Sequence, residues 1–183
     1  SSVKYIGHST FAGSSIPSLV LPETLTTLEY GAFASCKSLA SIKINNKLEV
    51  ISQRAFHSCT ALTDLTIGTR VESIGLEAFE DCTRLVELTI PDNVIYIYAE
   101  AFSGCSLLKK VVMGSGVLEI GNYAFQYCPQ LSDLTLGSSV KRIGHSAFAR
   151  SSITSLVLPE TLTTLDYGAF ASCKSLASIK INN

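Results

Sequence analysis

The sequence predicts an α/β repeat solenoid of about eight stacked units, each 22 or 23 residues long. Two observations predict this fold class. All eight phenylalanines recur at intervals of 22 or 23 residues, and all six cysteines lie three residues after one of them. A fixed period of about 20–50 residues is the signature of stacked supersecondary units. The two sets are Phe11, Phe33, Phe56, Phe79, Phe102, Phe125, Phe148 and Phe170, and Cys36, Cys59, Cys82, Cys105, Cys128 and Cys173.

Each unit begins with the pattern of a short strand. In the unit that runs from 62 to 82, Leu62, Leu65 and Ile67 alternate with polar residues in the second half of the pattern, which is typical of a strand with one buried face. A turn at Gly68 follows. Because the same positions are apolar in every unit, we expect the strands to stack about 4.8 Å apart as one parallel sheet on the concave face of the array.

The second half of each unit predicts a helical turn opposite the sheet. After the apolar pair Val71 and Ile74, the residues Ala78, Cys82 and Leu85 are spaced i, i+4 and i+7, as on one face of a helix. Phe79 is large enough to fill the gap between this turn and the strand. One unit cannot bury so much apolar surface alone, so each unit is expected to pack against its neighbours.

The two ends of the chain are near copies of each other. Residues 1–46 match residues 138–183 at 41 of 46 positions, an offset of six units, which indicates a block duplication. Neither end carries the polar cap that terminal units of solenoids usually need. We therefore expect residues 1–183 to form a single solenoid that is an interior fragment of a longer array, with uncapped ends that favour end-to-end self-association.

Composition and motifs argue against several classes of function. The net charge is −1 and Lys and Arg form no run, which argues against nucleic-acid binding. No apolar run approaches the ~20 residues of a membrane helix, so no direct membrane insertion is expected. The chain shows no paired catalytic carboxylates, Gly-rich phosphate loop or nucleophile–base pair. We therefore expect no enzyme activity, no cofactor and no metal site.

The cysteines and histidines are expected to be structural or superficial. Stacked cysteines would lie about 4.8 Å apart with parallel side chains, whereas a disulfide needs converging Cβ atoms about 3.8 Å apart. Buried free thiols are therefore the favoured interpretation. A linear ladder of thiols does not converge on one point, so zinc binding by the cysteines is disfavoured. The three histidines, His8, His57 and His145, are interpreted as surface residues.

The repeat resembles the BspA-like class of leucine-rich repeats, whose pattern is L-x-x-I-x-I-P-x-x-V-x-x-I-G-x-x-A-F-x-x-C. The fourth unit carries this pattern nearly intact, in Leu85, Leu88, Ile90, Pro91, Val94, Ile97, Ala101, Phe102 and Cys105. The departures are Ser14 and Ser151 at cysteine positions, and Glu29, Ser52, Tyr98 and Asp166 at glycine positions. The resemblance implies an extracellular, cell-surface adhesin or surface antigen that binds host-matrix or cell-surface proteins.

The concave strand face is the candidate protein-binding surface. Its centre is acidic at Asp64 and Glu87, with Lys110 beside it. The candidate binding residues are Asp64, Thr66, Glu87, Thr89, Lys110, Val112, Asp133 and Thr135.

Alternatives remain open at this point. Hydroxyl and β-branched residues also suit any exposed strand without binding anything. A Tyr-rich side formed by Tyr96, Tyr98, Tyr123 and Tyr127 is a rival binding surface, because tyrosine is a good interface residue. The alternative function is a structural spacer that holds another domain away from the cell and has no specific ligand.

Overall fold

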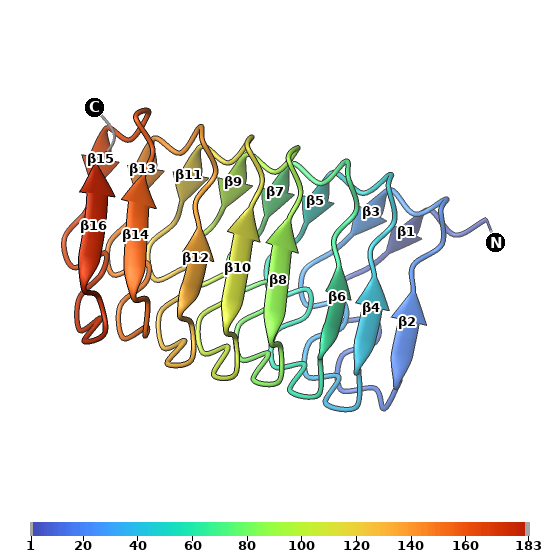
Figure 1. The fold of residues 1–183 in the computed structure, drawn as a ribbon. Helices are drawn as coiled ribbons and strands as arrows, with labels where there is room; N and C mark the ends of the chain where they lie inside the picture. Colours follow the sequence, from blue (N-terminus) through green and yellow to red (C-terminus); the bar gives the residue numbers. More distant parts are fainter. Residues whose placement is uncertain (1, 182–183) are drawn as a thin grey trace.

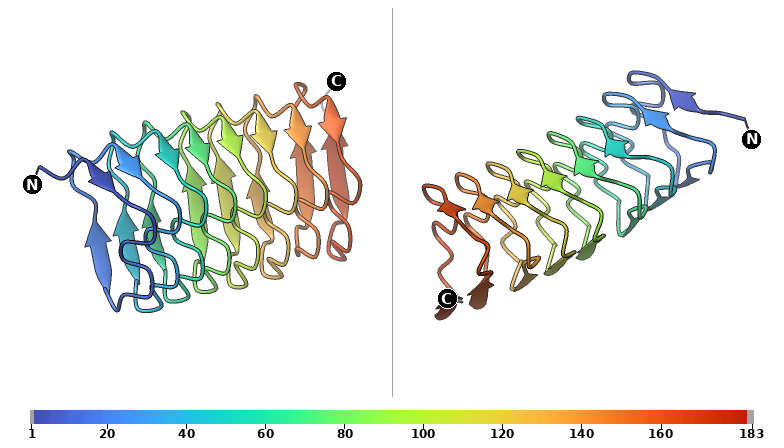
Figure 2. Two further views of the ribbon diagram at one scale, coloured as in Figure 1. Left: turned by 180° about the vertical axis from the view of Figure 1, so that it is seen from behind. Right: turned by 90° about the horizontal axis from the view of Figure 1, so that it is seen from above.

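The computed structural model describes residues 2–181 as a solenoid of stacked coils, each containing one of the eight phenylalanines (Figure 1). The chain enters at one end of the stack and leaves at the other. Each coil has a long strand and a short strand on different sides of the stack, as the views from behind and from above show (Figure 2).

The long strands follow the L-x-x-L-x-I pattern that the sequence analysis identified. They are β2 (Ser18–Val20), β4 (Ser41–Lys43), β6 (Asp64–Thr66), β8 (Glu87–Ile90), β10 (Lys110–Met113), β12 (Asp133–Thr135), β14 (Ser155–Leu158) and β16 (Ser178–Ile181). We call the solvent-exposed surface of these strands the long-strand face.

The second apolar pair of each unit forms a further strand of two residues, which the sequence analysis did not assign as a sheet. These strands are β1 (Tyr5–Ile6), β3 (Thr27–Leu28), β5 (Val50–Ile51), β7 (Ser73–Ile74), β9 (Tyr96–Ile97), β11 (Glu119–Ile120), β13 (Arg142–Ile143) and β15 (Thr164–Leu165). Six of them, β5 to β15, form one continuous sheet.

All strand pairing in the described residues is parallel, which confirms the predicted direction. The register follows the repeat: Lys110 on β10 lies opposite Glu87 on β8 and Asp133 on β12. The long strands, however, do not form one sheet. They pair as β2-β4-β6, β8-β10-β12 and β14-β16, so the ladder is interrupted between β6 and β8 and again between β12 and β14. Which face of the array is concave stays a prediction.

The phenylalanines form one continuous column through the core, as the repeat predicts. The rings of neighbouring coils are stacked with centroids 5.2–5.6 Å apart. The six inner rings, from Phe33 to Phe148, are fully buried, whereas Phe11 at the first coil is 38% exposed. Each ring therefore relies on the coils on both sides for its burial.

The predicted short helical turns are wrong, because residues 2–181 contain no helix. We number the coils by their phenylalanines, so that Phe79 lies in the fourth coil. We call the stretch around A-F-x-x-C the Phe segment; in the fourth coil it covers 75–82. Glu77 and Asp81 have φ of 55° and 57°, in the left-handed region, which a right-handed helix cannot contain. Alternate amides leave the coil: the Phe79 N–H donates to the carbonyl of Ala101 in the next coil at 2.8 Å, while the Cys82 N–H donates back to Phe79 at 3.3 Å. The i, i+4 spacing thus reflects two linked turns.

The six cysteines are free and buried, which confirms the expectation of unpaired thiols. Each thiol lies near the carbonyl of the phenylalanine in the preceding coil; Cys82 Sγ, for example, donates to Phe56 O at 3.5 Å. Burial raises the pKa of the Cys59 and Cys128 thiols to about 12. A protonated thiol fills space and satisfies a carbonyl, and it is a poor nucleophile and a poor metal ligand.

Candidate functional site

The structure places the eight predicted binding residues on four consecutive long strands, β6, β8, β10 and β12. Seven of them are exposed, and Val112 is half-buried between Thr89 and Thr135. Their side chains occupy the two outward-facing positions of each strand, because successive residues of a strand point to opposite faces. The sequence pattern was therefore sufficient to find which residues face outward on these strands.

The charged residues among them form a short row across β8, β10 and β12. Lys110 lies between Glu87 and Asp133 in the register, and its Nζ is 3.2 Å from Asp133 Oδ2. Both side chains of this ion pair are about half exposed, at 48% and 56%, so the pair contributes little to folding stability. Asp64 does not share this ladder, since β6 belongs to a different sheet from β8.

A groove runs along the long-strand face where β12 and β14 are not paired. Thr135 from β12 lines one side of it, and Ser155 and Val157 from β14 line the other. Glu160 in the following turn adds a carboxylate to its wall. The groove adjoins the row of candidate residues, and the repeat pattern did not predict it, because that pattern implies equal spacing of all strands.

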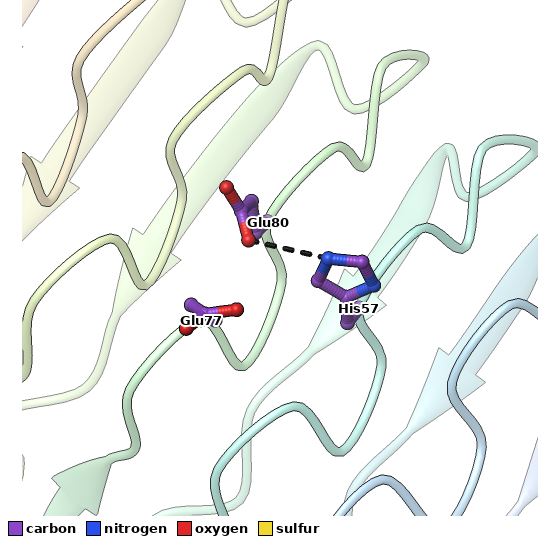
Figure 3. Close-up of side chains that lie close together, drawn as sticks. All are labelled: His57, Glu77 and Glu80. Carbon is purple, nitrogen blue, oxygen red and sulfur yellow. Dashed lines mark ion pairs between the residues drawn. The ribbon is translucent and has the colours of Figure 1, made fainter.

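A second group of polar side chains lies on the Phe segments of the third and fourth coils (Figure 3). His57 comes from the third coil, and Glu77 and Glu80 come from the fourth. Figure 3 shows the three side chains converging on a common space, with an ion pair of 3.2 Å between His57 Nε2 and Glu80 Oε2. Arg54 approaches Glu77, with its Nε 2.5 Å from Oε2, and its guanidinium also donates to the Tyr30 hydroxyl at 3.1 Å.

The repeat itself explains this convergence. Arg54, Glu77 and Glu100 occupy the position two residues before the phenylalanine in successive coils, and His57 and Glu80 occupy the position one residue after it. Side chains in one column lie on neighbouring turns of the stack, and the two columns are three residues apart on one surface. The basic side chains of Arg54 and His57 in the third coil therefore meet carboxylates of the fourth.

The two carboxylates of this group titrate in opposite directions. Burial alone would raise the pKa of Glu77, but hydrogen bonds from Arg54 and Glu80 outweigh it and hold the pKa below its usual value. Burial, together with the hydrogen bond to Glu77 and the charges of Glu77, Glu100 and Asp81, raises the pKa of Glu80 to about 7. Two carboxylates so close disfavour each other's ionisation, which is why the two pKa values move apart.

The sequence interpretation placed His57 at the surface and did not connect it with Glu77 or Glu80. The side chains are only partly accessible, with exposed fractions of 27% for His57, 13% for Glu77 and 21% for Glu80. Aligning the units would have found the group, because residues 23 positions apart lie on neighbouring coils. Searching for residue pairs close in sequence could not find it.

The rival tyrosine surface is divided between two places. Tyr96 and Tyr98 lie together, with tilted rings 6.1 Å apart, and both are exposed. Tyr123 instead packs edge-on against His145, and Tyr127 lies under the guanidinium of Arg150, 4.9 Å from its ring centroid. These contacts cover part of the rings of Tyr123 and Tyr127.

Comparison with known protein families explains the repeat. The sequence matches the BspA type leucine-rich repeat region over residues 1–109 and 96–183, with six copies of the repeat. This chain belongs to that family. The match extends over nearly the whole BspA-type solenoid described above and agrees with the column of phenylalanines and cysteines. No curated protein sequence matches the chain.

Solved structures share the fold. A leucine-rich repeat protein of T. pallidum superposes with a TM-score of 0.76 at 24% identity, covering 96% of this chain and 73% of that one. A leucine-rich cell surface protein of Faecalibacterium prausnitzii gives a TM-score of 0.52 at 24% identity, covering 99% and 70%. The pneumococcal vaccine antigen PcpA gives 0.53 at 18% identity, covering 99% and 54%. At these identities the likeness establishes the fold alone. Among residues 2–181 there is no helix with the length and hydropathy to cross a membrane.

Proposed function

We propose that this chain is a protein-binding module of a cell-surface protein and that it binds host-matrix or cell-surface proteins through its long-strand face. The family supports the surface location, because two proteins of similar fold are described as a cell surface protein and as a vaccine antigen. The fold supports binding in place of catalysis. Stacked repeats present an extended surface of exposed side chains, which suits docking of a protein.

One observation carries the choice of face. The row formed by Glu87, Lys110 and Asp133 is exposed and fixed in register by the strand ladder. It ends on β12, the strand whose Thr135 lines the groove between β12 and β14. A partner with complementary charge would meet acidic groups on either side of one lysine, and electrostatic complementarity of this kind sets specificity and association rate.

The same row predicts modest affinity. None of the eight candidate residues is aromatic or arginine, the residue types that dominate binding energy in protein interfaces. A single solenoid of this length is therefore expected to bind weakly. Several such blocks in one protein would act through effective concentration, where linked sites raise the overall avidity without new contacts. On this proposal, the chain is one part of a longer array.

The test is a triple substitution at the centre of the face. Asp64, Glu87 and Lys110 are each replaced by serine, the residue that Ser18, Ser41 and their counterparts already carry at this position of the repeat. Binding to immobilised extracellular-matrix proteins and to host cells is expected to fall by at least about tenfold, which corresponds to about 1.4 kcal/mol of binding free energy. The midpoint of thermal unfolding should stay nearly unchanged, because these side chains are exposed.

A matched control distinguishes the binding module from the spacer. Glu49→Ser, Arg70→Ser and Glu119→Ser together remove three exposed charges at or near the short strands, including the Glu49–Arg70 ion pair. This control should bind as the unmodified chain does. If the long-strand variant also binds normally, or if the unmodified chain binds nothing, the long-strand face is not the docking surface. The spacer would then be favoured if shortening the array changed function.

A further inference from the structure

The group on the Phe segments contains three side chains whose ligand atoms lie within 4.8 Å of one another. They are the imidazole of His57 and the carboxylates of Glu77 and Glu80, which approach from two neighbouring coils (Figure 3). We propose that these three residues form a binding site for one divalent transition-metal ion, and that Zn²⁺ is the ion that this donor set fits best.

The donor chemistry supports zinc. One imidazole nitrogen and two carboxylate oxygens are hard-to-borderline ligands, and sites with three protein ligands and an open fourth position are common for this ion. With bonds of about 2.0–2.2 Å, ligand atoms around tetrahedral zinc lie about 3.4 Å apart. His57 Nε2 and Glu80 Oε2 are already 3.2 Å apart, and the other separations, all within 4.8 Å, have to close by at most about 1.4 Å. Small rotations of the two glutamate side chains achieve this, because neither is fully buried.

The electrostatics favour a cation at this point. Three other carboxylates, those of Glu77, Asp81 and Glu100, act on Glu80, against the positive charges of Arg54 and of His57 when it is protonated. A bound divalent cation would offset this repulsion, and the carboxylates that ligate it must be ionised.

Arg54 is a positioning residue in this arrangement. Its Nε holds one oxygen of Glu77, which fixes the direction of the carboxylate toward His57 and Glu80. Hydrogen bonds from such outer groups to ligating carboxylates are a regular part of metal sites. Because Arg54 occupies the same column as Glu77, one coil earlier, the repeat builds this support without any additional loop.

The other histidines lack such a set. His8 has one carboxylate partner, Glu29, at 3.5 Å, and His145 lies between the rings of Tyr123 and Tyr167. Within residues 2–181, His57, Glu77 and Glu80 are the one group of three such side chains with converging ligand atoms. The cysteines do not compete for zinc in the folded chain, because their protonated thiols are buried against carbonyl groups.

Calorimetric titration of ZnCl₂ into the metal-stripped, tag-free chain tests the proposal. At pH 7.5 we expect one ion per chain with a dissociation constant in the micromolar range. His57→Ala and Glu80→Gln should each weaken binding by at least about tenfold, the loss seen even for outer-shell residues of metal sites.

His8→Ala is the matched control, since it removes a histidine that pairs with a single carboxylate, and its titration should match that of the unmodified chain. Circular dichroism confirms that each variant is folded. The proposal is overturned if the unmodified folded chain shows no saturable binding below about 100 μM Zn²⁺. It is equally overturned if His57→Ala and Glu80→Gln bind as tightly as His8→Ala, or if alkylating the cysteines abolishes binding while the folded state is retained. Because this site is not on the long-strand face, its result does not depend on the docking proposal.

Discussion

At the scale of the residue, Phe79 shows how the stack stabilises itself. Its ring is fully buried and lies 5.2 Å from the rings of both Phe56 and Phe102. Offset stacking adds to the transfer free energy of a large apolar side chain. Because the column is continuous, a gap at one ring removes contacts from two coils at once.

We therefore expect Phe79→Ala to lower the free energy of unfolding by about 3–5 kcal/mol, the range for large-to-small core substitutions. Phe11→Ala is the matched control, because Phe11 is partly exposed and stacks on one ring only. Phe11→Ala should lower the free energy of unfolding by less than half as much as Phe79→Ala. Equilibrium unfolding in urea measures both values. Equal costs for the two variants would show that the column does not act as a shared core.

The residues of the candidate metal site show where residue-by-residue reasoning fails. His57 alone resembles any surface histidine, and Glu77 and Glu80 alone resemble solvated carboxylates. Only the 23-residue stacking makes them neighbours. Their grouping could have been predicted by aligning the units, whereas the pKa of about 7 for Glu80 depends on burial and on Glu100 and Asp81, which require coordinates.

At the scale of the element, the Phe segment replaces the helical turn that the apolar spacing predicted. Two residues of each segment have positive φ, and in every coil at least one of them is not glycine; Ser58, for example, has a φ of 56°. Such a residue costs about 1 kcal/mol relative to glycine. The neighbouring coil provides the compensation, by accepting the amide hydrogen bonds that a helix would have kept internal.

This geometry predicts opposite effects of glycine at two serines of the third and fourth coils. Ser58→Gly should raise the free energy of unfolding by up to about 1 kcal/mol, because it removes the left-handed strain. Ser73→Gly, in strand β7, should lower the free energy by about 0.5–1 kcal/mol, because glycine weakens a strand. Urea unfolding of the two variants measures the difference. A destabilised Ser58→Gly variant would contradict the left-handed turn.

The long strands also show a limit of element-level prediction. Their positions, direction and register followed from the repeat, yet the ladder is interrupted after β6 and after β12. The chain loses one residue just before β14, but no residue is lost between β6 and β8, so unit length alone does not explain both interruptions. The groove beside Thr135 lies at the second of these interruptions, where β12 and β14 are not paired.

At the scale of the whole molecule, stability is expected to be a sum over coils and the interfaces between them. Deleting residues 85–107 removes one whole unit and joins Arg84 to Leu108, which preserves the repeat register. The shortened chain should still unfold cooperatively, with a midpoint lower by a few degrees. Deleting residues 85–96, about half a unit, is the control and should abolish cooperative unfolding, because it moves inward-facing residues to the surface. Thermal unfolding followed by circular dichroism distinguishes the two.

The sequence by itself determined the number of units, the parallel stacking, the buried phenylalanine column, the free thiols and the family. These follow from periodicity, because identical units bury the same columns wherever they stack. The tertiary structure decided the left-handed turns in place of helices, the second sheet, the interrupted ladder and the partial burial of His57, Glu77 and Glu80. Those features depend on hydrogen bonds and charges between coils, and a pattern read along one unit contains no information about contacts between units.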